Sequence, residues 1–519
     1  MFEQRMMWMK KLLLCIMAVL LVLSSGCGEE RAATADGNTL VYGSHDYERI
    51  NPIRDEYGEI DALLFDGLTR RDGTGMTVPA LAESWTYDEA THTYTFHLRA
   101  DVTWHDGKPL CADDVKFTIG AILDPKNRSL QRPYFEDVRE ITAVDAGTVR
   151  IQLAVHNEAF LDYMTQPILP AHLLAGEDLA QTGFFHRPIG TGPYKIESWE
   201  AGKEIVLVRN EHYYRGAPKI ERVIFRVTAN DDGEAAGLTD GNIDIARLTP
   251  KNADAFAGKT GYRCYDMTTT DYRAILYNFK HPYWQRNRDL IPAISYAVDR
   301  QAIVRDALFG HGIPAYGPLQ RNRYNNPNIE HYDYNPAKAR ALLEAAGCTM
   351  GAQGYYERGG EEVGFVLSVQ NDRFGRFEIV TAVAKQLNAV GIHCTVEQPA
   401  QVDWDGQMAY LIGWGSPLDA DAHTYKVFGT QQVANDGRYA NPRVDAYLTA
   451  ARQTRDPDER MRLYGLFQEE LAKDPPYTFV CYVDSIYVTN TRVHGITEDL
   501  LLGHRGSGIF WNIHEWTLD

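Results

Sequence analysis

Cysteines, basic clusters and long apolar runs are all scarce in this chain of 519 residues. It holds 7 cysteines and no C-x-x-C pair, so neither a zinc site nor a dense disulfide framework is indicated. Acidic residues outnumber basic residues by 70 to 52, and the net charge of −18 argues against nucleic acid as a partner. Glycine and proline are spread along the chain, which excludes fibrous and low-complexity classes.

The sequence also lacks the short motifs that carry common catalytic chemistry. No G-x-S-x-G, H-E-x-x-H or EF-hand loop occurs, and no G-x-G-x-x-G opens a helix. The segment 258–260 resembles the end of a phosphate-binding loop, but Ala253 stands where the first glycine of that loop is required. We therefore predict no catalytic residue, no metal site and no cofactor.

The one long apolar run lies near the N-terminus, at 12–23, after three basic residues. A helix of this length covers about 18 Å, short of the roughly 30 Å of a bilayer core, so a signal peptide is favoured over a membrane span. Small residues before Cys27 resemble a bacterial lipobox. We expect 1–26 to be a lipoprotein signal peptide, Cys27 to carry the lipid and 27–37 to be a tether. Ordinary secretion with an incidental cysteine is the alternative.

Strand and helix patterns alternate along the rest of the chain, whose length suits about three domain-sized units. Residues 93–98 alternate between polar and apolar, as in a half-buried strand, and apolar residues at helical spacing follow. Asp113 or Asp114 can cap that helix. A mixed α/β fold is therefore predicted. Helices are expected over 113–123, 336–346, 378–390 and 458–473, and a further strand over 392–396.

Several longer strings are more specific than these patterns. They are VPALAESW at 78–85, YTFHLR at 94–99, VTWHDGKP at 102–109, PIGTGPY at 188–194, GNIDIA at 241–246 and AISYAVDR at 293–300. Their sequences and their order along the chain closely resemble those of the family 5 extracytoplasmic solute-binding proteins, the peptide- and nickel-binding receptors of ABC importers. The resemblance covers nearly the whole chain after the N-terminal segment.

This resemblance implies a two-lobed periplasmic-binding-protein fold, in which two hinge strands join α/β lobes and the first lobe carries an extra subdomain. The ligand is enclosed between the lobes. We place the hinges near 265–279 and 478–488, where the sequence is strand-like. The predicted division is 38–58, 184–266 and 482–519 for the core of lobe I, 59–183 for its inserted subdomain, and 267–481 for lobe II.

The resemblance also directs attention to the loop after the strand that ends at Trp414. Peptide-binding relatives typically carry an aspartate three residues later, which pairs with the α-ammonium of the ligand, but here that position is Pro417. The loop looks more like that of nickel- and chelate-binding members. Asp419 or Asp421 could supply the carboxylate from a shifted loop, because a buried ammonium needs a partner. Alternatively, Asp419 caps the following helix and touches no ligand.

Further candidates lie where strands enter the expected cleft. Tyr47 follows the first strand, Arg247 follows the GNIDIA string, and Tyr272 and Arg273 precede the hinge strand. Arginine can hold a carboxylate through two hydrogen bonds, and tyrosine offers an aromatic wall with one polar tip. The candidate ligand-binding residues are therefore Trp414, Asp419, Asp421, Tyr47, Arg247, Tyr272 and Arg273.

The function that the resemblance implies is that of an importer receptor. It would enclose a short peptide by hinge closure and deliver it to an ABC permease and its ATPase. Nickel or another metal chelate, opine-like in chemistry, is the alternative ligand. A secreted hydrolase is the alternative from another class, and the missing catalytic motifs argue against it. We expect a monomer outside the cytoplasm, held to the membrane by its lipid alone.

Overall fold

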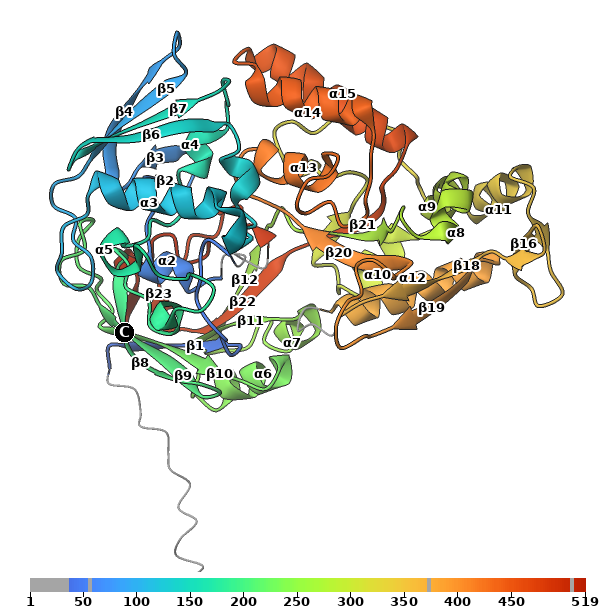
Figure 1. Cartoon of the computed structure of the whole chain (residues 1–519). Coiled ribbons are helices and arrows are strands. Elements are labelled where there is room, and N and C mark those ends of the chain that lie inside the picture. The colour runs from blue at the N-terminus through green and yellow to red at the C-terminus, as the bar shows by residue number, and fades with distance from the viewer. Residues whose placement is uncertain (1–36, 55–57, 371–374, 505–507) are drawn as a thin grey trace, which may run out of the picture.

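The computed structural model describes residues 37–54, 58–370, 375–504 and 508–519. Two large sheets, each with its own helices, form two bodies that we call lobe I and lobe II, and a smaller sheet stands at one end of lobe I (Figure 1). Strands and helices alternate throughout, so the predicted mixed α/β class is confirmed. The predicted signal peptide, Cys27 and the tether up to residue 36 lie outside the described residues.

A seven-stranded sheet forms the centre of lobe I. The first strand, β1, is buried at all six positions and pairs in parallel with β10 and β11, whereas the outer pairs are antiparallel. Burial on both faces agrees with the mainly apolar sequence of this strand. In spatial order the sheet is β12 (Tyr262–Met267), β22 (Ser485–Asn490), β11 (Ile245–Leu248), β1 (Thr39–Ser44), β10 (Arg222–Val227), β9 (Glu204–Arg209) and β8 (Tyr194–Glu200). Helices α6 (Asp231–Thr239) and α7 (Pro250–Asp254) and the pair β23 (Val493–His494) and β24 (Thr517–Leu518) complete it.

The region between β1 and β8 adds an antiparallel four-stranded sheet and a short hairpin. Its apolar side chains belong to the same continuous core as those of the seven-stranded sheet, so the subdomain and the rest of lobe I are packed as one body. The sheet is β4 (Ala82–Asp88), β5 (Thr93–Leu98), β7 (Thr148–Leu153) and β6 (Val138–Asp145), the hairpin is β2 (Thr69–Arg71) and β3 (Thr77–Pro79), and the helices are α2 (Asp61–Leu64), α3 (Ala112–Leu123), α4 (Phe160–Tyr163) and α5 (Ala171–Leu174).

Lobe II is built on a six-stranded sheet with helices on both faces. Alternate residues of β13 enter different cores: Ile275 and Tyr277 pack on one face, and Ala274 and Leu276 on the other, as strand geometry requires. The sheet is β14 (Gly312–Pro314), β21 (Tyr477–Val483), β13 (Tyr272–Tyr277), β20 (Ala409–Trp414), β18 (Gly364–Ser368) and β19 (His393–Glu397).

The helices of lobe II divide between those two cores, and a small hairpin sheet lies at the far end (Figure 1). One core contains residues of α8 (Pro282–Asn287), α9 (Ile291–Ala297), α10 (Arg300–Asp306), α11 (Pro336–Ala345) and α12 (Arg376–Val390). The other contains residues of α13 (Asp421–Phe428), α14 (Pro442–Gln453) and α15 (Pro457–Lys473). The small sheet is β15 (Thr349–Met350), β16 (Tyr356–Arg358) and β17 (Glu361–Glu362).

The chain passes between the two large sheets at two places. It leaves β12 at Met267 and enters β13 at Tyr272, and it leaves β21 at Val483 and enters β22 at Ser485. The two connections are tied together, because the Thr269 hydroxyl donates to the Val483 carbonyl over 2.6 Å. Both lie within the segments predicted as hinges. The residue limits assigned to lobes and subdomain stay a prediction.

The predicted helices are present, with one correction at a cap. The helix expected to start from Asp113 or Asp114 begins at Ala112, and Cys111 is its N-cap. Asp114 is buried at the third helical position, where its carboxylate accepts hydrogen bonds from the backbone N–H groups of Cys111 at 2.9 Å and Ala171 at 2.8 Å. It therefore closes the capping box from inside the helix.

In the described part of the chain, no helix combines the length and the apolar character that crossing a bilayer requires. The cysteines described there are free thiols: Cys111, Cys264, Cys348, Cys394 and Cys481.

Candidate functional site

A cavity of about 310 Å³ lies between the two lobes. Lobe I lines it with residues of α2 and β2, with parts of 131–134, 165–167 and 193–215, and with His504 and residues of 508–514. Lobe II lines it with the loop 414–418 and α13. The volume lies at the lower end of the range for small-molecule sites. We call this space the interlobe cavity.

Positive charge dominates the ionised side chains of the interlobe cavity. Four cationic residues line it, against the two carboxylates Asp61 and Asp66, although the protein as a whole carries −18. Such a local excess attracts anionic groups. The cationic residues are Arg70 and Arg71 of β2, Arg215 in the segment after β9, and Lys426 of α13.

Asp66 is held in a cluster of tyrosines on the lobe I side. The hydroxyls of Tyr213 and Tyr214 donate to its Oδ1 over 3.2 and 3.4 Å. Burial raises the pKa of Asp66 to about 6, while the charge of Arg215 and the tyrosine hydrogen bonds oppose the rise. This carboxyl group therefore changes its charge just below neutral pH.

Three imidazoles also line the interlobe cavity. Burial lowers the pKa of His423 to about 3 and that of His514 to about 4, so both rings are neutral at pH 7. His423 Nε2 lies 2.9 Å from the Tyr272 hydroxyl, and His504 Nδ1 lies 2.8 Å from Asp271 Oδ1. Within the described ranges, no group of three or more His, Cys, Asp or Glu side chains could hold a metal ion. A metal ion would therefore have to bring most of its ligands with it.

Trp414 lies where the sequence predicted it, at the end of β20 and on the wall of the cavity. Its ring is half-buried, and Lys426 Nζ stands 5.5 Å from the ring centroid. The next residue has to be glycine, because a Cβ on Gly415 would lie 2.3 Å from the Thr270 carbonyl oxygen. The tryptophan loop is thereby packed directly against the connection between the lobes.

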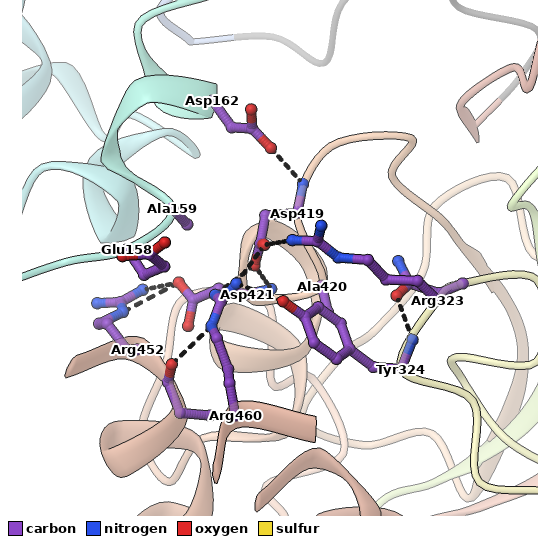
Figure 2. A network of polar contacts seen from close by, with 12 residues as sticks. Glu158, Ala159, Asp162, Arg323, Tyr324, Asp419, Ala420, Asp421, Arg452 and Arg460 are labelled. Carbon is purple, nitrogen blue, oxygen red and sulfur yellow. Dashed lines mark hydrogen bonds and ion pairs between the residues drawn. The ribbon is translucent and has the colours of Figure 1, made fainter. Parts of the chain in front are cut away.

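Asp419 and Asp421 are engaged by arginines behind this loop (Figure 2). Arg460 donates to both carboxylate oxygens of Asp419 over 2.6 Å, and Arg452 donates to Asp421 Oδ2 over 2.9 and 2.6 Å. Neither aspartate lines the interlobe cavity. Asp419 Oδ1 also accepts the Asp421 N–H over 2.9 Å, but the N-cap of α13 is Ala420, so Asp419 stands one residue before the cap and does not cap the helix itself.

The same loop touches lobe I. Asp162 accepts the backbone N–H of Asp419 over 2.8 Å, and the Tyr163 hydroxyl donates to Asp421 (Figure 2 shows the first of these). The Tyr134 hydroxyl donates to the Ala422 carbonyl over 2.9 Å. We call these three hydrogen bonds the interlobe contact. They join the region between β1 and β8 to lobe II beside the cavity.

The remaining predicted residues lie near the cavity without lining it. Tyr272 is fully buried, and its hydroxyl lies 2.9 Å from Nε2 of His423, which lines the cavity. Arg273, 2% exposed, donates to Asp271, and Arg247 Nε lies 3.8 Å from Glu59 Oε1. These two arginines line a separate interlobe space of about 30 Å³.

The ring of Tyr47 packs against that of His45 in a tilted arrangement with centroids 4.3 Å apart, and Tyr47 does not line the interlobe cavity. A role for Tyr47, Arg247, Tyr272 and Arg273 in ligand binding stays a prediction.

The sequence analysis missed most of the charged lining. Arg70 and Arg71 stand in a strand of only three residues, too short for a pattern of alternation to be recognised. Two signals were available: adjacent arginines directly after the apolar stretch that contains Asp66, and a C-terminal segment, 504–516, that combines two histidines with two tryptophans. Histidines and tryptophans that gather in a segment without regular secondary structure favour a role in binding for that segment.

Comparison with known proteins gives consistent results. The family model described as bacterial extracellular solute-binding proteins, family 5 Middle, matches residues 77–435. Protein XP55 of Streptomyces lividans is 32% identical over 496 residues, which cover 92% of this chain and 90% of that protein.

Solved structures share the fold. The structure of NikZ from Campylobacter jejuni in complex with Ni(L-His) has a TM-score of 0.88 and 34% identity, covering 93% of this chain and 100% of that one. AppA from Bacillus subtilis in complex with a nonapeptide has a TM-score of 0.83 and 24% identity, covering 93% and 99%. The predicted two-lobed α/β class is confirmed by this shared fold.

Proposed function

Since this chain belongs to the family 5 bacterial extracellular solute-binding proteins, we propose that it captures a small carboxylate-bearing solute for an ABC importer. The solute would occupy the interlobe cavity and be passed unchanged to the permease and its ATPase. Contacts with both lobes would favour the closed arrangement to the extent that the solute binds it better than the open one.

The observation that carries this proposal is the cationic lining of the interlobe cavity. Arg70, Arg71, Arg215 and Lys426 face a space with only two carboxylates. Guanidinium groups bind carboxylates through paired hydrogen bonds, and such charge-assisted bonds are the strong ones. A solute rich in carboxylate groups therefore suits the cavity better than a cationic or apolar one.

Among such solutes, we propose a nickel–amino-acid chelate as the cargo. Three observations support it: the small cavity, the neutral imidazoles of His423 and His514, and the 34% identity to a protein solved with Ni(L-His). A chelate brings its own ligands, as the cavity requires. A neutral imidazole can still offer a lone pair to the metal.

A short peptide is the second candidate, and Asp66 is the feature that favours it. A carboxylate with two tyrosine hydroxyls beside it can accept the α-ammonium of a peptide. The carboxylates first considered for that role, Asp419 and Asp421, are already bound to arginines. The volume of about 310 Å³ favours a peptide much shorter than the nonapeptide of AppA.

Native mass spectrometry and calorimetric titration test this proposal. The purified protein should bind nickel in the presence of L-histidine and should bind trialanine weakly, and the bound species should be released chemically intact. Arg215→Gln should weaken nickel–histidine binding, whereas Arg209→Gln, a matched change at a surface ion pair, should not. Tight trialanine binding without nickel–histidine binding would transfer the assignment to peptides.

The proposal includes the predicted location. The sequence pattern before Cys27 supports cleavage after residue 26 and lipid attachment at that cysteine, and the acidic surface supports contact with the membrane through the lipid alone. We propose a monomer, in which each chain closes around its own solute.

A further inference from the structure

Four buried N–H donors lie on residues that line the interlobe cavity and have no hydrogen-bond acceptor in the described part of the protein. They are Arg70 Nε, Arg71 Nη1, Trp414 Nε1 and Trp511 Nε1. A buried donor without an acceptor costs free energy, and most such groups in proteins are paired. These four are donors and require acceptors, while the lining also holds one buried acceptor oxygen, Asp61 Oδ1, that forms no hydrogen bond with any of them.

The two arginines direct these donors to different sides of the β2–β3 hairpin. Arg70 and Arg71 are successive residues of β2, and successive side chains of a strand point to opposite faces. The lining therefore divides into two groups, each with one arginine of this pair.

The first group lies within lobe I and contains Arg70, Arg215 and Trp511. Burial, and next the nearby charge of Arg215, lower the pKa of Arg70, so the two guanidinium groups are neighbours. Arg215 Nη1 donates to the Trp511 carbonyl over 3.5 Å, which ties the third member to the second. Like charges held this close favour an anion beside them, and the Asp66 carboxyl group, whose pKa both arginines lower, already lies near them.

The second group spans both lobes and contains Arg71, Trp414 and Lys426. Burial lowers the pKa of Arg71, and the charges of Asp162 and Asp419 oppose this, so Arg71 lies on the side of the interlobe contact. Lys426 Nζ stands 5.5 Å from the centroid of the Trp414 ring. Each group thus combines two cations with one indole N–H.

The acidic residues of the cavity have hydrogen-bond donors of their own. Asp66 accepts from the hydroxyls of Tyr213 and Tyr214, and Asp61 Oδ2 accepts the Gly58 N–H over 2.6 Å. They form no hydrogen bond with the four donors. A carboxylate group, with two oxygens and about four lone-pair sites, meets the requirement of either donor group.

We propose that the interlobe cavity binds a solute with two carboxylate groups, one held by Arg70, Arg215 and Trp511 and the other by Arg71, Trp414 and Lys426. This rests on the proposed function and specifies its solute class. The second carboxylate bridges the lobes, since Arg71 belongs to lobe I and Trp414 and Lys426 to lobe II. Only a solute with both groups gains fully from closure.

Calorimetric titration with paired probes tests the proposal on the full chain at pH 7. One pair is nickel with two L-histidines, which carries two carboxylates, and nickel with two L-histidinamides, which carries none. The other pair is L-Ala-L-Glu, with two carboxylates, and L-Ala-L-Gln, with one. Within at least one pair, the two-carboxylate probe should bind about 10- to 100-fold more tightly.

Single N–H groups are tested by Trp414→Phe and Trp511→Phe, which keep an aromatic ring. Each should weaken the preferred two-carboxylate probe about 3- to 10-fold and leave its amide partner unchanged. Trp199→Phe is the matched control, because Trp199 is a half-buried ring of β8 that does not line the cavity. If Trp199→Phe weakened binding of the two-carboxylate probe as much as the other two variants, the effect would come from folding and the proposal would be overturned.

The outcomes separate this proposal from the proposed cargo. If L-Ala-L-Glu is preferred over L-Ala-L-Gln and nickel–histidine is not bound, the nickel cargo fails and the two-carboxylate site stands. If nickel–histidine and nickel–histidinamide bind equally and the dipeptides do not differ, the cargo stands and the site fails. Failure of every two-carboxylate probe to bind would also overturn the site.

Discussion

Single side chains of the interlobe cavity differ from their solution behaviour mainly because they are buried. Asp66 keeps its carboxyl group among tyrosines and near two arginines, and burial still outweighs those partners in setting its pKa at about 6. His423 and His514 are shifted in the opposite sense by the same cause. The charge of the cavity therefore depends on pH through Asp66, while His423 and His514 stay neutral at pH 7.

This shift predicts a pH dependence of stability. The pKa of Asp66 is raised from 3.8 to about 6 on folding, so the folded state holds the proton more tightly. Its contribution to stability is complete below about pH 4 and is lost as the pH rises through 6. Asp66→Asn cannot ionise, so the Tm of this variant minus the Tm of the wild type should increase by about 2 °C or more from pH 4 to pH 7. Thermal unfolding without ligand measures this, and a constant difference across the range would contradict it.

The buried pair of Asp421 and Arg452 gives a second prediction for single residues. Asp421→Asn leaves the guanidinium of Arg452 buried opposite a neutral amide, and breaking such a pair costs about 3 kcal/mol or more. Asp458→Asn, at an exposed position in the first turn of α15, should change the free energy of unfolding little. Urea denaturation compares the two, and equal stabilities would show that the pair contributes nothing.

At the scale of elements, caps and fully apolar strands were predictable, whereas the meeting of distant segments was not. Asn335 caps α11 and Gly391 ends α12 with a φ of +98°, as local sequence signals indicate. The cap of α3 was assigned wrongly because the buried Asp114 acts from inside the helix.

The candidate site shows the same limit. Trp414 follows a strand that is easy to recognise, and its place on the cavity was predictable from the family resemblance. The two arginines of β2 that line the same cavity come from a three-residue strand more than 300 residues earlier, and no local pattern predicts that these segments meet. The carboxylates near Trp414 were predicted as ligand-binding groups because the local sequence does not show their partners. Those partners, Arg452 and Arg460, lie on helices that follow later in the chain.

The interlobe contact predicts how helix α13 and the inserted subdomain control closure. Tyr163→Phe removes the hydroxyl that donates to Asp421 across the lobes, and Asp162→Asn replaces the charged acceptor of the Asp419 N–H. Together they should speed dissociation of the bound solute at least tenfold, because one hydrogen bond to a charged group contributes about 1.5–3 kcal/mol and about 1.4 kcal/mol corresponds to a factor of ten. Stopped-flow fluorescence measures this rate.

Tyr94→Phe is the matched control for this measurement, since Tyr94 is buried within the subdomain sheet. If the solute dissociated faster from Tyr94→Phe, or at an unchanged rate from the double variant, the interlobe contact would not contribute to closure.

At the scale of the whole molecule, the predicted anchor determines where the receptor works. Cys27→Ala should leave folding and solute binding intact and should move the protein from the membrane fraction to the soluble fraction, because lipid attachment needs that thiol. Fractionation followed by immunoblotting measures the distribution. Sedimentation of the variant with membranes would refute lipid attachment at this residue.

The position of β22 has a consequence for the order of folding. This strand lies between β11 and β12 in the sheet of lobe I, yet it follows β21, the last strand of lobe II, along the chain. Lobe II is continuous from β13 to β21, so all of its strands are available before β22 emerges. Lobe I, which begins the chain, can complete its sheet only after lobe II has been synthesised. A chain truncated after Val483 should therefore retain a protease-resistant lobe II beside a lobe I with unpaired edges at β11 and β12.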